Sequence, residues 1–348
     1  MKSQTRYKSC EPELKSPVPL CAADGSLNRP GVGWSRRPLH ALNLAGPWGR
    51  QKRWNYWCVT DGELLFSVTL SSLDYVGAAF VYLWHQPTGQ FIEQTVLRPL
   101  ARGCQLPDIV DGDLYFDDRR LSLRLTRGTR ADGAQTMIAV DARDFGGGPL
   151  AARLTVEHPA NLDTLNVVIP WSERRFQFTS KQHCLPTTGE VRWAGGSHAF
   201  DSSRTFGCLD FGRGVWPYRT TWNWGGSSSR QQGRTIGLNL GGQWTDGTGM
   251  TENGVVVDGR LHKIGEVVRF DHQADLMQPW TVHTPDSDYV QLTFTPQYER
   301  VAKSNLLVVA SEVHQMLGQF HGQLRIDDGP PLELAAAFGW VEEHWARW

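Results

Sequence analysis

The feature that most constrains the fold is a series of short segments in which apolar and polar residues alternate with a period of two. From Trp54 to about Trp171 such segments, rich in Val, Leu, Thr and aromatic residues, follow one another at intervals of roughly 8–12 residues. Asp61-Gly62 and Pro87-Thr88-Gly89, which separate the first of them, are typical of hairpin turns. No long stretch in this half shows a helical period with caps. The pattern therefore predicts an all-β unit of meandering antiparallel strands.

Segments of the same kind continue to the C-terminus, and a chain of 348 residues exceeds what one hydrophobic core usually serves. We therefore expect two antiparallel β-barrels or sandwiches in tandem. The joint is expected at Pro186 and Gly189, giving domains 20–185 and 186–348 after a poorly ordered polar tail at 1–19. The last segment, ELAAAFGWVEEHWARW, also has a helical reading, but Gly339 in its middle favours a strand.

Composition narrows the classes of partner. The chain carries 35 Lys+Arg against 36 Asp+Glu, which gives no electrostatic reason to expect nucleic acid or an anionic membrane. Six scattered cysteines form no CxxC pair, so reduced thiols are expected rather than a zinc site or a disulfide framework. The sequence has neither a signal-peptide apolar run nor a stretch long enough for stable membrane insertion. We expect a cytoplasmic protein with a neutral or weakly charged ligand, and nothing in the sequence indicates an oligomeric state.

Most of the candidate functional residues lie in the stretch from Asp210 to Lys263. In this stretch tryptophans alternate with amide and carboxylate residues. Such a mixture is more typical of a concave binding site for a bulky ligand than of an aliphatic core. The alternative is that Gly-rich hairpins carry these rings as packing residues. Alternation along WNWG places Trp222 and Trp224 on one face and Asn223 on the other, and a strand near the C-terminus would point Glu342 and His344 the same way. The candidate ligand-binding residues are Trp216, Trp222, Asn223, Trp224, Asn239, Trp244, Asp246 and Glu342.

Four residues are candidates for catalysis. Glu252 follows a Gly-rich turn beside aromatic residues, where desolvation would raise the pKa of a general acid or base. Asn253 has the same setting, and the pair could equally cap a turn. Asp210 stands in LDFGRG, where a side chain at such a turn often bonds nearby backbone amides instead. Tyr218 supplies a phenol that can donate to a developing oxyanion, or it can simply complete the edge of a core.

Other chemistries lack their motifs. The eleven histidines show no HxH, HxxxH or HExxH spacing, so no metal site is predicted. GxSxG, a P-loop and a Rossmann fingerprint after a strand do not occur. We predict no cofactor and no serine nucleophile.

Several stretches, taken in order, resemble the domain of unknown function 2804 family. They are RWNYWCVTDGELLFSVTLSSLDYVG, LDFGRGVWPYRTTWNWG, IGLNLGGQWTDGTGMTENGVVVDG and GQFHGQL. The resemblance covers nearly the whole chain from about Leu20. It implies no established reaction.

Two short motifs are similar to a wider group, the two-domain lipocalin-like proteins that include carotenoid 1,2-hydratases, tocopherol cyclases, fungal Diels-Alderases and ceramide-binding survival factors. WNWG matches a His-Asn-Trp-Gly type motif, and GWVEEH matches a Gly-Tyr-x-Glu motif at Gly339 and Glu342. This resemblance implies two calycin-type antiparallel barrels with an apolar ligand in one barrel or at their interface. The hydratase His falls on Trp222, which removes the implied proton donor unless Glu252 or Asp246 takes its role.

The function we predict is cofactor-independent hydration, isomerisation or cyclisation of a hydrophobic small molecule such as a terpenoid, polyketide or lipid. In this hypothesis Trp222, Trp224 and Trp244 shape the pocket, Glu252 transfers the proton, and Asn253 and Tyr218 hold developing charge. A non-catalytic carrier of the same ligand is the first alternative. A carbohydrate-binding β-sandwich is the second, and it requires a flat aromatic strip facing solvent.

Overall fold

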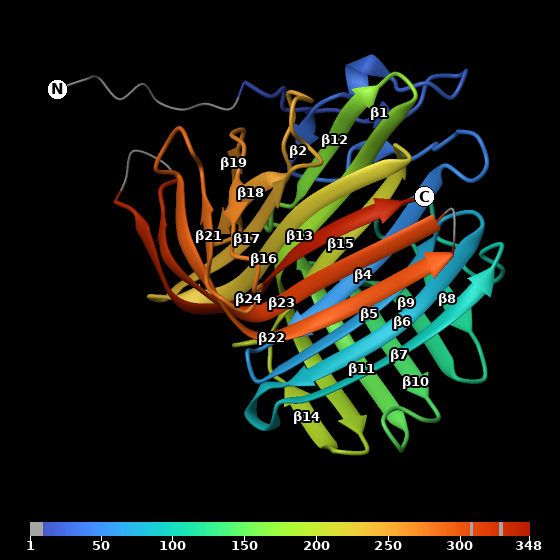
Figure 1. The fold of residues 1–348 in the computed structure, drawn as a ribbon, viewed down its shortest axis with the longest axis vertical. Coiled ribbons are helices and arrows are strands. Elements are labelled where there is room, and N and C mark those ends of the chain that lie inside the picture. The colour runs from blue at the N-terminus through green and yellow to red at the C-terminus, as the bar shows by residue number, and fades with distance from the viewer. Residues whose placement is uncertain (1–9, 307–308, 327–329) are drawn as a thin grey trace.

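The computed structural model describes residues 10–306, 309–326 and 330–348 and is built of β-strands. Within these ranges the only helical segments are two 3-10 turns, η1 (Arg29–Gly31) and η2 (Gln86–Thr88). Neither has the length or apolar character needed to cross a membrane. The strands form two large, strongly curved antiparallel sheets and one small parallel pair, β1 (Val18–Pro19) with β3 (His40–Ala41) (Figure 1). The predicted all-β class is confirmed.

The first sheet follows the order β7-β6-β5-β4-β15-β13-β11-β10-β9-β8; in addition β12 and β14 pair with β13, and β2 pairs with β12. The strands that alternation predicts are present here, and most hairpins turn where Gly, Pro or Asp interrupts the pattern. The bounds are β2 (Trp34–Ser35), β4 (Gln51–Thr60), β5 (Leu64–Ser72), β6 (Val76–His85), β7 (Gln90–Pro99), β8 (Leu114–Asp117), β9 (Leu121–Arg130), β10 (Gly133–Ala142), β11 (Leu150–Pro159), β12 (Leu165–Ser172), β13 (Arg175–Trp193), β14 (Gly196–Phe200) and β15 (Phe206–Val215).

The second sheet follows the order β19-β18-β17-β16-β24-β23-β22-β21-β20. Its last strand is the segment for which a helix was the alternative, so the preference for a strand is confirmed. The bounds are β16 (Arg219–Gln231), β17 (Arg234–Gly242), β18 (Asn253–Val257), β19 (Arg260–Ile264), β20 (Arg269–Asp271), β21 (Trp280–His283), β22 (Val290–Leu306), β23 (Val309–Leu324) and β24 (Leu332–Arg347).

The two sheets divide the chain later than expected. Pro186 and Gly189, the predicted joint, lie inside β13 and pair with β15 and β11 in the first sheet. The chain changes sheet only at residues 216–218, between β15 and β16. The expected joint rested on turn-forming residues, but here they belong to a strand that bends. A register shift between Gln182 and Leu185, with a positive φ of 58° at Cys184, lets β13 serve two sets of neighbours.

The expected disordered tail also needs correction from Glu11 onward. Glu11 is buried. The backbone N–H of Leu14 donates to Trp34 O, and the backbone N–H of Trp34 donates to Pro12 O. Residues 1–9 lie outside the described residues. The N-terminal segment therefore contributes to the packed structure before Leu20.

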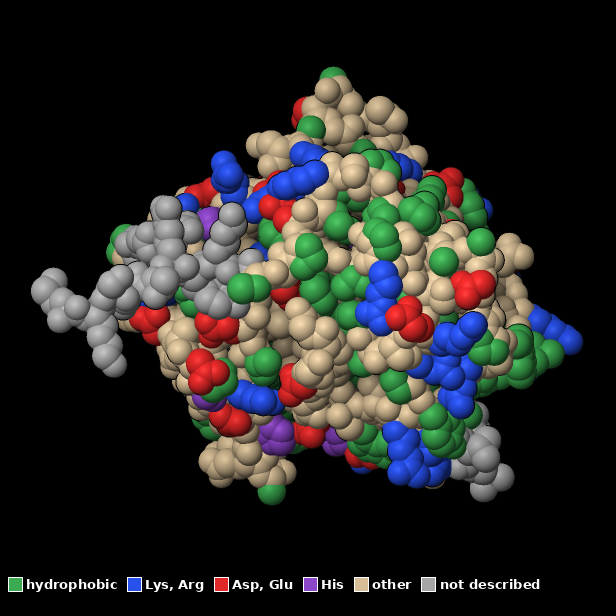
Figure 2. All heavy atoms as spheres, turned by 90° about the horizontal axis from the view of Figure 1, so that it is seen from above, with side chains coloured by type: hydrophobic (Ala, Val, Ile, Leu, Met, Phe, Trp, Pro, Cys, Tyr) green, Lys and Arg blue, Asp and Glu red, His purple; other side chains and the backbone are tan. Residues whose placement is uncertain are grey.

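Each sheet has an aliphatic core on one face, and a third apolar cluster lies where the sheets meet. In Figure 1 the strands β22 to β24 lie across β4 to β7. Charged side chains of both signs are spread over the outer surface seen in Figure 2. Few charged side chains are buried, and several of the buried ones lie between the two sheets.

Candidate functional site

A cavity of about 620 Å³ lies between the two sheets. This volume is within the range of roughly 300–1,000 Å³ that holds a drug-sized ligand. Its walls come from β4 to β7, β13 and β15 on one side and from β16 and β22 to β24 on the other. Leu97 and Val301, which line one end, are about half exposed, so the cavity opens there.

Strand register explains which side chains of the first sheet reach the cavity. Directly paired residues of neighbouring strands form one row across the sheet, and because alternate residues face one side, the whole row points inward. The row runs from β13 to β7 through Lys181, Asp210, Tyr56, Thr69, Phe80 and Thr95. All six line the cavity. The row places charge at one end and apolar or hydroxyl groups at the other.

The second sheet contributes two such rows. One passes through Trp224, Glu342, Gln315 and Arg300, and the next through Trp222, His344, Val313 and Ala302. Every one of these residues lines the cavity. The predicted alternation is therefore confirmed: Trp222 and Trp224 share a face without Asn223, and Glu342 and His344 point the same way.

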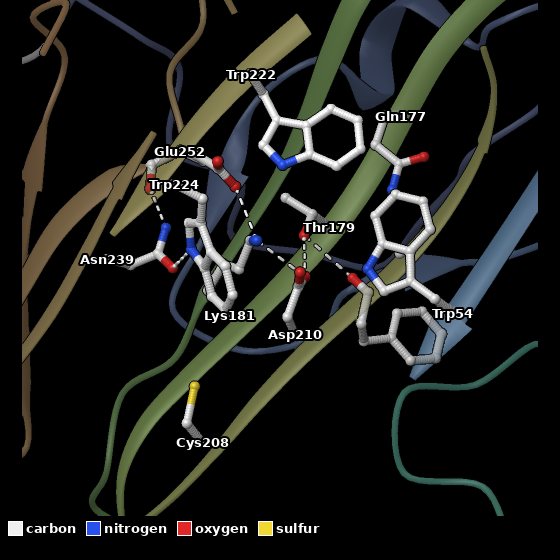
Figure 3. Close-up of polar contacts among 12 residues, drawn as sticks. Trp54, Gln177, Thr179, Lys181, Cys208, Asp210, Trp222, Trp224, Asn239 and Glu252 are labelled. Carbon is white, nitrogen blue, oxygen red and sulfur yellow. Dashed lines mark hydrogen bonds and ion pairs between the residues drawn. The ribbon is translucent and has the colours of Figure 1, made fainter. Parts of the chain in front are cut away.

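Lys181 is the centre of the charged end. Its Nζ lies 2.9 Å from Asp210 Oδ1 and 3.1 Å from Glu252 Oε2, and 4.5 Å from the centroid of the Trp224 ring (Figure 3). All three charged side chains are nearly inaccessible to solvent. Burial alone would lower the pKa of Lys181, but the two carboxylates outweigh it and raise that pKa above its ordinary value. Lys181 therefore stays an ammonium ion.

Glu252 is held by several groups. Trp244 Nε1 donates to Glu252 Oε1 at 2.9 Å, and the carbonyl oxygen of Glu252 accepts from Asn239 Nδ2 at 2.7 Å. Gly241 leaves the space for this carboxyl group, since a Cβ there would lie 2.1 Å from Oε1. Burial raises the pKa of Glu252, and the Lys181 charge opposes that rise. The side chain is 1% exposed, so it does not face bulk solvent.

Glu342 is a second buried carboxyl group, on the facing sheet. Trp222 Nε1 donates to its Oε1 at 2.7 Å. Burial raises the pKa of Glu342 to about 7, although the Trp222 hydrogen bond works against the rise. The ring of the neighbouring His344 packs on that of Trp222, with the two ring centroids 3.7 Å apart. Burial lowers the pKa of His344 to about 3. Near neutral pH Glu342 therefore exchanges its proton while His344 stays neutral.

Hydrogen bonds tie the sheets together along the floor of the cavity. Tyr56 Oη lies 2.9 Å from Tyr82 Oη, which donates to Gln315 Oε1 at 2.8 Å. Arg300 pairs with both carboxylate oxygens of Glu93 at 2.7 and 3.0 Å. The Tyr82–Gln315 bond joins β6 with β23, and the Arg300–Glu93 pair joins β22 with β7. They fix the distance between the facing rows.

The predicted site residues fall into two groups. Seven line the cavity: Asp210, Trp216, Trp222, Trp224, Trp244, Glu252 and Glu342. Trp216 stacks on Trp244 with ring centroids 5.5 Å apart and donates to Gln177 Oε1. Some of these rings therefore pack on one another as well as on the cavity.

The other five do not line it. Tyr218 is 40% exposed and lies against Arg50 at the surface. Asp246 pairs with Arg269 in a partly exposed position. Three buried amides support the walls instead: Asn223 bonds to Glu342 O, Asn239 to Trp224 Nε1, and Asn253 to Gly241 N and Glu266 O.

Apart from Asp210, sequence reasoning missed the residues that the first sheet supplies. Lys181, Thr179 and Tyr56 line the cavity but lie outside the stretch from Asp210 to Lys263. The sequence of β13 offers little signal, because Ser180 and Gln182 make its other face polar as well. Asp210 was among the candidates, but its pairing with Lys181 cannot be identified without the register of β13 and β15.

One group of potential metal ligands lies elsewhere in the described residues. Asp61, Glu63 and His198 are close enough to share an ion. His198 Nε2 is already 2.8 Å from Asp61 Oδ2, and Arg204 lies 3.2 Å from the same oxygen. Arg204 also lies 3.7 Å from Glu63 Oε2, so a cation would have to displace a guanidinium that already pairs with both carboxylates.

Comparison with known proteins gives a family and remote structural similarities. No curated protein matches the sequence. Among solved structures, a protein of Nitrosomonas europaea described as AttH is 14% identical, with 84% of this chain and 92% of that chain covered and a TM-score of 0.48. CghA with Sch210972 is 11% identical (85% and 88% covered, TM-score 0.49), and kievitone hydratase from Nectria haematococca is 9% identical (84% and 88%, TM-score 0.45).

At these identities and TM-scores the similarities assign no activity or ligand to this chain. The family model does extend over nearly the whole sequence, since "Domain of unknown function (DUF2804)" matches residues 11–348. This confirms the resemblance found in the sequence motifs. The chain belongs to the DUF2804 family.

Proposed function

We propose that this protein is a cofactor-independent hydratase, isomerase or cyclase that acts on a hydrophobic small molecule by acid–base chemistry in the cavity between its sheets. The observation that carries the proposal is a buried carboxyl group, Glu342, facing a ligand-sized chamber with aromatic walls. A general acid works best when its pKa lies near the operating pH, and the pKa of Glu342 is about 7.

The walls favour a largely apolar ligand. Indole rings and Phe80 make up much of the lining, with Leu73, Ala78 and Leu97 toward the opening. Thr69 Oγ1 and Trp348 Nε1 are buried, and the described protein atoms give neither a hydrogen-bond partner. Both residues line the cavity, so a ligand with one or two polar groups would satisfy them.

We assign proton transfer to Glu342 rather than to Glu252. Glu252 is engaged by Lys181 and by Trp244, and protonating it would break the ion pair with Lys181. Glu342 has one donor, the Trp222 indole, and no cation among the ion pairs of the described residues. It can therefore give up and regain a proton at small electrostatic cost.

The charged end favours a developing positive charge. At this end of the cavity one ammonium group, that of Lys181, faces two carboxyl groups, those of Asp210 and Glu252. A protonated alkene would be stabilised by these carboxyl oxygens and by the faces of nearby indole rings. Water or an internal nucleophile then adds to the cation and its surplus proton passes to the Glu342 carboxylate, or a neighbouring carbon gives a proton to that carboxylate. These outcomes correspond to hydration, cyclisation and isomerisation.

The two alternatives make different demands on the same residues. A carbohydrate-binding sandwich requires a flat, exposed aromatic strip, whereas Trp216, Trp224 and Trp244 are buried around a cavity. A carrier requires only the cavity. The carrier is therefore the alternative that experiment must separate from an enzyme.

The test begins with native mass spectrometry of the protein purified from its own host, to identify a co-purifying apolar molecule. That molecule is then incubated with wild-type protein and with Glu342→Gln. An enzyme should lose about 10²–10⁴ in turnover, the usual contribution of a general acid, with little change in affinity. Conversion that is absent in wild type, with binding retained, would establish a carrier and refute the proposed reaction.

A further inference from the structure

A second buried ion pair lies behind Glu252, outside the cavity lining. Lys263 of β19 pairs with the carboxylate of Glu11, and both side chains are almost completely buried. Lys263 Nζ also donates to Thr251 Oγ1 at 2.6 Å and to Ile264 O at 3.0 Å. The same Glu11 carboxylate accepts from the backbone N–H of Thr251. Two residues far apart in sequence thus hold the residue that precedes Glu252.

The N-terminal segment is itself anchored to the first sheet. Leu14 N donates to Trp34 O at 2.7 Å, and Trp34 N donates to Pro12 O at 2.9 Å. Trp34 Nε1 donates to Glu11 O at 3.2 Å. Because β2, which contains Trp34, pairs with β12, Glu11 is connected through backbone bonds to the sheet that supplies Lys181.

This arrangement fixes the backbone on both sides of the Glu252 side chain. Glu11 and Lys263 hold Thr251 on one side, and Asn239 Nδ2 holds the Glu252 carbonyl on the other. The direction of the carboxyl group is then set before it meets Lys181 or Trp244. A displacement of about 1 Å in a catalytic site can cost about 10²-fold in rate.

The charge of Lys263 makes Glu11 necessary. Burial lowers the pKa of Lys263 to about 8, while Glu11 and Glu252 oppose that change. Without Glu11, the buried ammonium would either lose its proton or turn toward Glu252 and compete with Lys181. In both cases Thr251 loses its support and the Glu252 carboxyl group is free to move.

We propose that Glu11 is a positioning residue, which holds Thr251 and neutralises Lys263 so that Glu252 keeps its ion pair with Lys181. The catalytic meaning of this role rests on the proposed function, but the geometric role does not. The N-terminal segment is then a working part of the site rather than a tail.

The test uses the indole N–H of Trp244, which donates to Glu252 Oε1, as a reporter in ¹H–¹⁵N NMR spectra. Its resonance is assigned with Trp244→Phe. In Glu11→Ala the resonance should shift and its exchange with water should accelerate at least about tenfold, because the Glu252 acceptor moves. Glu11→Gln should be intermediate, since an amide oxygen can still accept from Thr251.

Glu13→Ala is the matched control, because Glu13 lies two residues away and pairs with Lys15 and Arg36 in a more exposed position. It should leave Trp244 unchanged. The indole N–H of Trp280, a residue of β21 in the second sheet, donates to Leu276 O. Its resonance should stay constant in every variant. A wild-type Trp244 signal in Glu11→Ala would overturn the proposal.

A second variant covers the case in which Glu11→Ala does not fold. Replacing a buried ion pair by apolar side chains of similar size is often neutral or stabilising, so Glu11→Met with Lys263→Met should fold. It still removes the acceptor for Thr251 N–H, so Trp244 should shift, and an unshifted Trp244 would refute the role of Glu11. None of these readouts needs turnover, so they separate this inference from the proposed reaction.

Discussion

Replacing Lys181 by Met should destabilise the fold in a strongly pH-dependent way. Lys181 Nζ lies about 3 Å from two buried carboxylates, at 2.9 and 3.1 Å. With an effective dielectric constant of about 20, each attraction is worth about 5 kcal/mol before desolvation. Breaking a buried ion pair has a net cost of about 3–5 kcal/mol, since it leaves uncompensated charge. We expect a loss of that size in the free energy of unfolding at pH 8.

The pH dependence follows from Glu252. Its pKa in the folded protein is already raised by burial, and Lys181 opposes the rise. Without Lys181 that pKa must rise further above its unfolded value. A carboxyl group with a raised folded pKa loses stability as pH increases from the unfolded to the folded pKa, by about 1.4 kcal/mol per unit. The deficit of Lys181→Met should therefore be small at pH 5 and largest near pH 8.

Urea unfolding at pH 5, 6.5 and 8 measures this effect. Lys181→Met combined with Glu252→Gln should recover most of the pH-dependent loss, because the buried carboxyl group that causes it is removed with its partner. Lys15→Met, which breaks an exposed pair with Glu13, should cost less than about 1 kcal/mol at every pH. A deficit for Lys181→Met below about 1 kcal/mol at pH 8, or one that does not change with pH, would refute this reasoning.

Three further predictions address the cavity walls. The pKa of Glu342 is raised to about 7 from an ordinary 4.5, so the wild-type protein should lose about 3 kcal/mol of stability between pH 4.5 and pH 8. In urea titrations Glu342→Gln should lack this change of stability with pH. An equal change in both proteins would contradict the buried acid. Gly241→Ala should leave the protein folded but expel the Glu252 carboxyl group, which a Cβ would meet at 2.1 Å, and so shift the Trp244 indole resonance; Gly225→Ala, whose nearest neighbour is 3.2 Å away, should not. Tyr82→Phe should cost about 1–3 kcal/mol because buried Gln315 Oε1 loses its donor, whereas Tyr115→Phe, at an exposed position, should cost less than about 0.5 kcal/mol; similar losses in both would argue against a polar tie between the sheets.

Local pattern predicted much of the fold and part of the site. Period-two alternation identified the strands of both sheets, and it correctly placed Trp222 with Trp224 and Glu342 with His344. It misjudged Pro186 and Gly189, because a bulged strand uses the same residues as a turn. It also assigned Tyr218 and Asn253 to the cavity. Tyr218 lies at the surface, and the Asn253 side chain bonds to Gly241 N behind the cavity wall.

The remaining features depend on contacts between distant segments. Lys181 and Asp210 meet because β13 pairs with β15, and Glu252 joins them from the other sheet. Glu11 reaches Thr251 across 240 positions of sequence. No local pattern encodes such pairings, since they are set by register and by how one curved sheet packs on the other.

Deuterium transfer tests the central claim most directly, namely that Glu342 exchanges a proton with a ligand held between the sheets. The apolar molecule extracted from the protein is incubated in D₂O with wild-type protein or with Glu342→Gln, and its carbon-bound deuterium is measured by mass spectrometry. We predict incorporation with wild type and a rate lower by about 10²–10⁴ with the variant. Incorporation at equal rates, or none with either protein while the molecule still binds, would contradict it.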